Sequence, residues 1–113
     1  MKLARIGNPG KEKPIIVDKD NNYRDVSSVI KDFNSENLNF ETLEKLNNIK
    51  PEDLPILEKN QRIGACVHKP SKFIGIGLNF KDHAIEQNMP IPKEPIIFSK
   101  FTNSVSGPND DIV

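Results

Sequence analysis

Residues 72–113 read KFIGIGLNFKDHAIEQNMPIPKEPIIFSKFTNSVSGPNDDIV, and most of the predicted functional residues lie in this stretch. It begins with an apolar run, residues 73–78, whose β-branched side chains and short length predict a buried strand. Gly75 and Gly77 in that run indicate a turn or a close approach of another part of the molecule. A second apolar run, residues 95–98, predicts a strand that leads to Lys100, and a polar turn follows.

A short helix is predicted between these two strands, over residues 80–88. Asn79 stands where an N-cap belongs, and Asp82 follows three residues later as in an imperfect capping box. The helix must end before the next proline, which lacks an N–H donor and restricts the residue before it. His83 and Glu86 are three residues apart and therefore share one helix face. The stretch thus predicts half of an active site.

Composition limits the class of protein. The chain has 113 residues, which is one domain or less, and its 16 basic and 16 acidic residues give a net charge of zero. This balance argues against nucleic acid or an anionic membrane surface as partner, because both usually need a basic excess. The single Cys66 cannot form an intramolecular disulfide. Since the sequence also has no apolar stretch of roughly 20 residues and no signal peptide, we expect a cytoplasmic protein.

The first 60 residues predict a small β-rich module. Its expected strands, separated by polar turns, are residues 2–6, 14–17 and 23–26. Phe40, Leu43 and Leu46 predict one apolar face of a short helix, and we expect this face to be core. After a proline-flanked turn, residues 56–57 and 62–67 predict extended structure. Within the latter, Cys66 is expected to be a small core residue.

Three motifs resemble the fumarylacetoacetate hydrolase family. They are IGLNFKDHAIE at residues 76–86, EPIIFSK at 94–100 and GPND at 107–110. The opening of the chain also resembles bacterial members that act on 2,4-diketo acids or related 2-oxo acids, through MKLARIG at 1–7, KP at 13–14 and RDVS at 24–27. The resemblance therefore covers nearly the whole chain in order.

The resemblance implies an α+β fold that is mainly β. It divides the chain into an N-terminal β-rich module, residues 1–60, and the truncated start of a fumarylacetoacetate hydrolase-like catalytic domain, residues 61–113. The implied activity is that of a hydrolase or lyase that uses Mg²⁺ or Mn²⁺ to cleave a C–C bond in a 2-oxo or 2,4-diketo acid. The family also implies a homodimer at full length.

The resemblance also assigns roles to five residues. His83 is the base, Glu86 is its partner, and Lys100 contacts the substrate or the enolate, while Asn79 and Phe80 are substrate contacts. An unperturbed histidine can take a proton from water near neutral pH, and a carboxylate can orient its ring. Phe80 stands where the family more often has tyrosine, so a hydroxyl is missing there. By spacing alone, a His/Glu pair is typical of a solvated surface pair worth about 0.2–0.5 kcal/mol, and the motifs favour the functional interpretation.

The family's metal ligands, a Glu-x-Glu pair and an aspartate, are expected beyond its GPND turn and past Val113. The sequence therefore predicts no metal site here and a fragment that is inactive alone. Three interpretations stay open. The chain is part of a metal-dependent enzyme, a non-catalytic fragment or interaction module, or one half of an enzyme completed by a separately encoded half. Within the first, C–C hydrolysis, decarboxylation, ureidoglycolate cleavage and a catechol-pathway hydratase or isomerase reaction also stay open.

Overall fold

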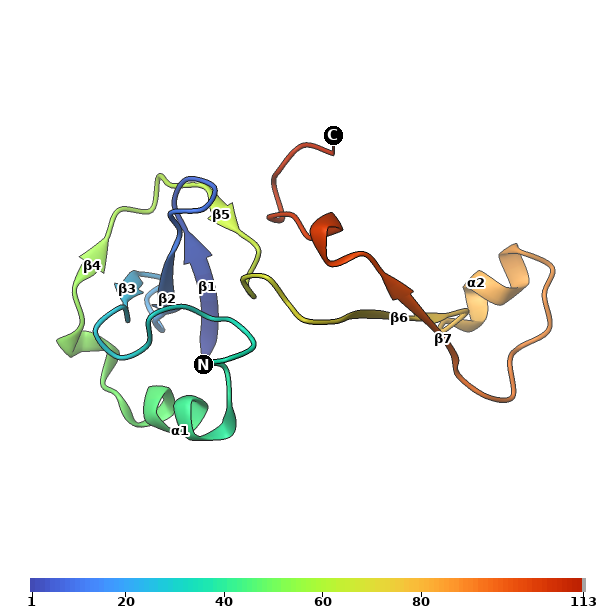
Figure 1. Cartoon of the computed structure of the whole chain (residues 1–113), viewed down its shortest axis with the longest axis horizontal. Helices are drawn as coiled ribbons and strands as arrows, with labels where there is room; N and C mark the ends of the chain where they lie inside the picture. The colour runs from blue at the N-terminus through green and yellow to red at the C-terminus, as the bar shows by residue number, and fades with distance from the viewer. Residues whose placement is uncertain (113) are drawn as a thin grey trace. The chain divides into compact units, whose positions relative to one another are not determined.

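The computed structural model describes residues 1–112, which fall into two compact units. Unit 1 comprises Met1–Pro70 and the segment from Val105 onward, and unit 2 comprises Ser71–Ser104. Over the described residues the chain forms seven β-strands in two antiparallel sheets and two α-helices (Figure 1). This confirms the predicted class, α+β and mainly β.

Unit 1 is built on a five-stranded sheet in the order β4-β3-β2-β1-β5. Tight turns join its first three strands into two successive hairpins, and Leu3 lies opposite Ile16 in the first. The turn between the first two strands uses Gly7 at φ 123° and Gly10 at φ 76°, conformations that suit glycine. The five strands are β1 (Lys2–Ile6), β2 (Lys13–Val17), β3 (Tyr23–Asp25), β4 (Ile56–Leu57) and β5 (Ile63–Gly64).

The core of unit 1 lies between this sheet and helix α1 (Phe40–Asn48), whose Leu46 packs with Ile16, Val26, Ile30 and Phe33. The side chain of Asn39 caps the helix by accepting a hydrogen bond from the Thr42 N–H at 2.9 Å. The predicted apolar face is only partly right, because Phe40 is 92% exposed. Its position explains the error: six residues at 3.6 per turn place Phe40 about 120° around the helix from Leu46.

The segment after β4 differs from the prediction of extended structure over residues 62–67. A single 3₁₀ turn, η1 (Pro51–Asp53), precedes β4, and only β5 pairs with β1 farther along. The chain then leaves the sheet where the Arg5 guanidinium donates to the Ala65 carbonyl oxygen at 3.1 Å. As a result Cys66 is exposed, and the expectation that it belongs to the core is wrong.

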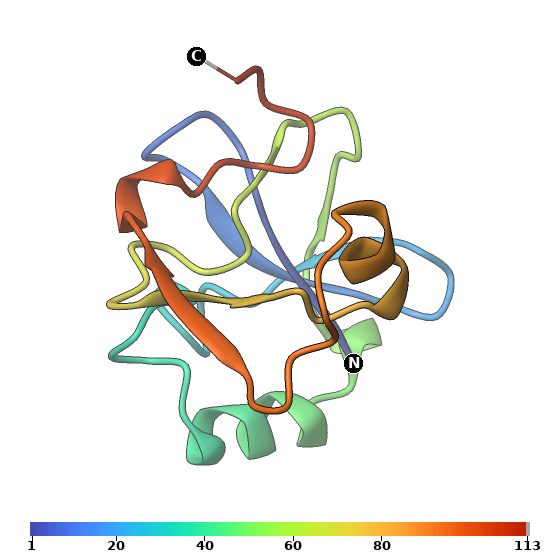
Figure 2. The same ribbon diagram turned by 90° about the vertical axis from the view of Figure 1, so that its right-hand side faces the viewer.

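Unit 2 is a two-stranded ribbon of β6 (Phe73–Gly77) and β7 (Ile96–Lys100), with α2 (Lys81–Glu86) between them along the chain (Figure 1, Figure 2). The register places Phe73 opposite Lys100 and Gly77 opposite Ile96. All three elements are of the predicted type and lie within about two residues of their predicted bounds. However, β6 is not the buried strand that was expected, because β7 is its one strand partner among the described residues and Ile74 stays 56% exposed. A short 3₁₀ turn, η2 (Thr102–Ser104), follows β7.

The boundaries of the two units differ from the predicted division at residue 60. Residues 61–70 and the segment from Val105 onward belong to unit 1, where long-range polar contacts hold them. The assignment of residues 1–60 and 61–113 to separate domains stays a prediction. Among residues 1–112, the helices are all too short or too polar to cross a membrane.

Candidate functional site

Helix α2 of unit 2 carries the predicted His/Glu pair. The Nδ1 atom of His83 lies 3.7 Å from Oε2 of Glu86, and both side chains are largely exposed. The three-residue spacing puts them on one face, as the sequence predicts. With Nδ1 directed at the carboxylate, Nε2 remains the ring nitrogen that is open to solvent or a substrate. At 3.7 Å the two atoms are close enough for an ion pair but farther apart than in a hydrogen bond, so Glu86 lies beside the ring without fixing its orientation.

The start of α2 differs from the prediction. Phe80, not Asn79, occupies the N-cap position, with extended φ −113° and ψ 135° and no hydrogen bond from its side chain. The predicted Asn79 cap and the capping box to Asp82 are therefore wrong, because the helix begins one residue later than that pattern requires. Both residues predicted as substrate contacts, Asn79 and Phe80, are exposed.

Two residues in the left-handed region border this helix. Leu78, between β6 and α2, has φ 48°, and Asn88, just beyond the helix, has φ 52°. Asparagine tolerates this conformation, whereas a leucine there costs roughly 1–2 kcal/mol. Strained residues of this kind cluster at functional sites and switch regions. Sequence reasoning missed the left-handed conformation of Leu78, because its neighbours are compatible with an ordinary strand end.

The structure does not bring Lys100 to the His83/Glu86 pair. Lys100 ends β7 opposite Phe73, whereas β6 continues toward α2 from Gly77, at the other end of the ribbon (Figure 1). The four residue steps from Phe73 to Gly77 span about 13 Å along a strand. The Nζ atom of Lys100 instead lies 5.5 Å from the centre of the Phe73 ring, within the range of a cation–π interaction.

A hollow of about 370 Å³ lies in unit 2 where β6 ends. Asn79, Lys81, Lys93 and Glu94 supply its polar lining, beside apolar residues of β6 and the 91–95 segment. Its volume is within the range of small-molecule sites. Of the five predicted site residues, Asn79 lines the hollow. Sequence reasoning missed both Lys81 and Lys93 as lining residues. Lys81 is local to Asn79, whereas the approach of Lys93 depends on how the 91–95 segment folds back.

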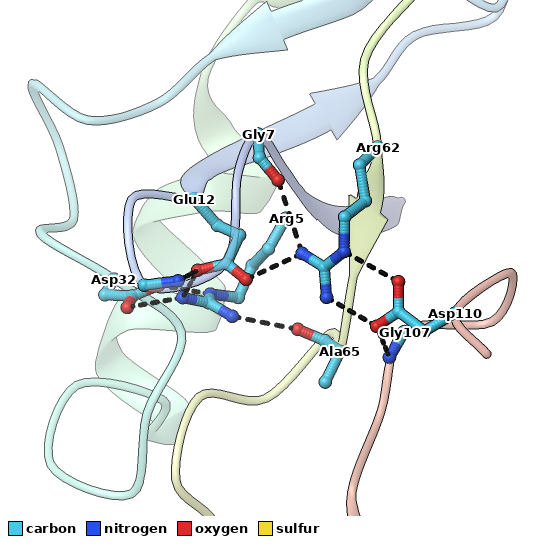
Figure 3. A network of polar contacts seen from close by, with 9 residues as sticks. Arg5, Gly7, Glu12, Asp32, Arg62, Ala65, Gly107 and Asp110 are labelled. Carbon is cyan, nitrogen blue, oxygen red and sulfur yellow. Dashed lines mark hydrogen bonds and ion pairs between the residues drawn. The ribbon is translucent and has the colours of Figure 1, made fainter. Parts of the chain in front are cut away.

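Unit 1 contains a network of paired charges that lies outside the predicted site (Figure 3). Arg5 is 3% exposed and donates to Asp32, with Nε 2.6 Å from Oδ1. Glu12 accepts from both Arg5 and Arg62, at 3.3 Å and 2.9 Å. Burial alone would raise the pKa of Glu12, but its hydrogen bonds, including that from Arg62, outweigh burial and lower it. Glu12 therefore stays ionised at neutral pH. Its contacts join parts of unit 1 to one another, which is a structural role.

The part of the chain that the structure describes contains no group of three or more His, Cys, Asp or Glu side chains placed to hold a metal ion. Divalent magnesium or manganese is normally held by oxygen ligands that converge from separate positions. The described residues alone therefore do not fit the metal that the resemblance implies.

Comparison with known proteins finds relatives in several Burkholderia species. The chain is 50% identical over 112 residues to a protein of Burkholderia multivorans and 51% identical over 112 residues to one of Burkholderia cenocepacia, both named "Putative hydrolase". Each match covers 99% of this chain. No family model matches the sequence. The chain spans about 40% of the length of these relatives.

Proposed function

We propose that this chain is part of a hydrolase of the fumarylacetoacetate hydrolase type that cleaves a C–C bond in a 2-oxo or 2,4-diketo acid. The names of the Burkholderia relatives support the hydrolase class. The three motifs in residues 76–110 support the family. The observation that carries the proposal is the His83/Glu86 pair, with Nδ1 and Oε2 3.7 Å apart on an exposed helix.

In the proposed reaction, Nε2 of His83 takes a proton from water while Glu86 stabilises the resulting imidazolium. The hydroxide adds to the carbonyl carbon distal to the substrate carboxylate. The tetrahedral adduct then collapses, the C–C bond breaks, and its electron pair leaves on the 2-oxo acid fragment as an enolate. Protonation of that enolate completes the balance: one diketo acid and one water give one carboxylic acid and one 2-oxo acid.

The positive charges of unit 2 suit an anionic substrate. Lys81 and Lys93 line the hollow beside Asn79 and could bind the substrate carboxylate there. Lys100 is the proposed contact for the enolate, but it lies at the end of the ribbon away from α2. The proposal therefore requires α2 to move over β6 and β7, so that His83 and Lys100 reach the same small molecule. The proposal assigns Mg²⁺ or Mn²⁺ to ligands outside residues 1–112, in the part of the relatives that this chain does not match.

The test begins with the polypeptide purified from its natural source, whose intact mass shows whether residues 1–113 belong to a longer chain. Pyruvate release from an acylpyruvate is then followed with Mg²⁺ present. His83→Ala is expected to lower kcat by roughly 10²–10⁴-fold, and Glu86→Gln to lower it less. Glu41→Gln is the matched control, because Glu41 is an exposed helical glutamate in α1.

The proposed function is overturned if His83→Ala and Glu41→Gln turn over substrate at the same rate. Ureidoglycolate and a catechol-pathway hydratase or isomerase substrate are assayed in parallel. If the protein acts on one of these substrates and the activity depends on His83, that reaction replaces C–C hydrolysis as the proposed activity. The proposed role of the His83/Glu86 pair is then retained. The 113-residue chain alone is expected to be inactive.

A second candidate, a non-catalytic interaction module, is favoured by the apolar surface of unit 2. Its large exposed apolar side chains include Ile74, Phe80, Ile85, Ile97 and Phe101. A contiguous apolar surface of a few hundred Å² is typical of an interaction site, and the second candidate requires that these side chains form one. Its proposed occupant is the additional polypeptide present in proteins of the relatives' length. This candidate predicts binding of that polypeptide with no turnover, and the assay above separates the two.

A further inference from the structure

Residues 62 and 110 are joined across a long excursion of the chain. The chain leaves unit 1 after Pro70, forms unit 2, and belongs to unit 1 again from Val105. Nε of Arg62 donates to Oδ1 of Asp110 at 2.6 Å, and Nη2 of Arg62 donates to Oδ2. This two-point contact between a guanidinium and a carboxylate is a strong, directional form of ion pair. It closes a loop that contains all of unit 2.

The GPND motif, which the proposed reaction does not use, shapes this contact. Oδ2 of Asp110 accepts a hydrogen bond from the Gly107 N–H at 2.7 Å, and the Asp110 N–H donates to the Gly107 carbonyl oxygen at 3.2 Å. These hydrogen bonds within the turn hold the Asp110 carboxylate in the position where Arg62 contacts it. Gly107 is buried, and a Cβ there would collide with the carbonyl oxygen of Ile63. Only glycine lets the turn approach the backbone of β5 this closely.

Arg62 is held from its other side by the turn between β1 and β2. Nη1 of Arg62 donates to Oε1 of Glu12 at 2.9 Å and to the Gly7 carbonyl oxygen at 3.3 Å (Figure 3). Glu12 is fixed in turn by Arg5 at 3.3 Å and by the Gly10 N–H at 2.9 Å. Glu12 and the Gly7 carbonyl oxygen therefore hold one side of the Arg62 guanidinium, and its other side faces Asp110.

We propose that the GPND motif is a clasp, in which Asp110 grips Arg62 and fixes the segment after Val105 on the first sheet. The clasp closes the loop of chain that contains unit 2 and holds residues 107–110 next to β5. Ordering the ends of a loop of this length costs conformational entropy, and the two-point ion pair offsets that cost. The role of the clasp does not depend on which reaction the His83/Glu86 pair performs.

Amide hydrogen exchange of the 113-residue chain tests the clasp directly. Asp110→Asn removes the charge and one acceptor, and we expect the amides of Gly107 and Asp110, which are hydrogen-bonded within the turn, to exchange on the order of 10- to 100-fold faster. Asp111→Asn is the matched control, because Asp111 is the exposed carboxylate next in sequence. Gly107→Ala keeps every charge but blocks the approach to Ile63, so it is expected to release the same segment. Arg62→Lys keeps the charge without the two-point geometry and is expected to release it in part.

The amides of β2 serve as an internal reference, because that strand is central in the sheet of unit 1. The clasp is supported if the Gly107 and Asp110 amides lose protection while the β2 amides keep it. It is overturned if Asp110→Asn exchanges like Asp111→Asn. It is equally overturned if β2 loses protection to the same extent, since the ion pair would then act only on the overall stability of unit 1.

Discussion

Units 1 and 2 have similar apolar runs but bury them very differently. Seven of the eight buried hydrophobic residues among the described residues belong to unit 1, and unit 2 contributes Ala84 alone. In β2 of unit 1, Ile15 is 0% exposed, whereas Ile97 in β7 of unit 2 is 68% exposed. An apolar run therefore becomes part of a core only when a second layer of structure covers it. A two-stranded ribbon with a six-residue helix supplies no such layer.

Charges follow the same division. In unit 1 two buried charged residues have partners of opposite charge: Arg5 pairs with Asp32, and Asp18 pairs with Arg24. In unit 2 the His83/Glu86 pair is exposed and Lys100 lies over an aromatic ring. The residues proposed to act in chemistry are therefore in the less buried unit. Lower local stability is common in elements that bind ligands or close over them.

The largest expected effect comes from truncating the core of unit 1. Phe33 is 0% exposed, and Phe33→Ala leaves a cavity that is expected to cost about 3–5 kcal/mol in the free energy of unfolding. Phe80→Ala is the matched control in unit 2, since that ring is 74% exposed, and we expect it to cost less than about 0.5 kcal/mol. Urea unfolding followed by circular dichroism measures both. Equal losses would mean that the two units share one core.

The next effect is the difference in hydrogen exchange between the two sheets. Amides of β1 and β2 open only with the core, whereas those of β6 and β7 belong to an isolated ribbon of marginal stability. We expect the β6 and β7 amides to exchange on the order of 100-fold faster in the 113-residue chain, which corresponds to roughly 3 kcal/mol. Similar rates in both sheets would contradict the division. The additional polypeptide proposed above as the occupant of the apolar surface can then be added. If only the β6 and β7 amides exchange more slowly in its presence, that polypeptide covers them.

How far the sequence predicts the fold depends on whether a feature is set locally. Strands and helices appear within a few residues of their predicted places, because side-chain periodicity, glycines and prolines act over short distances. Burial was predicted less well. Phe40, Cys66 and Ile74 are apolar or small and were expected inside, yet the tertiary arrangement leaves each of them exposed.

The candidate site shows the same limit. The approach of His83 to Glu86 follows from a spacing of three residues on a helix, so the sequence could predict it. The separation of Lys100 from that pair follows from the register of β6 with β7, which the sequence does not specify. The Arg62–Asp110 pair joins residues 48 apart, and nothing in the local pattern pairs them. The GPND motif gave a family resemblance there but no physical role.

A smaller effect is expected from pH, and it reports on the charges of unit 1. Burial alone would raise the pKa of Asp18, but hydrogen bonds from the Asn22 N–H and the Arg24 guanidinium outweigh it and lower the pKa from 3.8 to about 2. Because the unfolded chain binds this proton more readily, the stabilisation is present above pH 3.8 and is lost as pH falls toward 2. We expect Asp18→Asn to reduce the slope of unfolding free energy against pH in that window.

Asp20→Asn is the control for this measurement, because Asp20 is an exposed carboxylate of the same loop. Other carboxylates of unit 1, among them Glu12 and Asp110, also have lowered pKa values and act in the same direction. The variant should therefore flatten the slope without abolishing it. An unchanged slope in Asp18→Asn would show that the Asp18–Arg24 pair does not distinguish the folded from the unfolded chain.

The smallest expected effect concerns Leu78, whose φ of 48° connects β6 to α2. Leu78→Asn places a residue that tolerates the left-handed region, so exchange at the β6 and β7 amides should change by less than about fivefold, or roughly 1 kcal/mol. Leu78→Val has a β-branched side chain that resists this conformation, so the same amides should exchange faster than in Leu78→Asn. Neither variant should change the unfolding of unit 1, where Leu78 has no part. The Leu78→Val and Leu78→Asn variants could instead give the same exchange rates. The connection between β6 and α2 would then not require a left-handed residue at position 78.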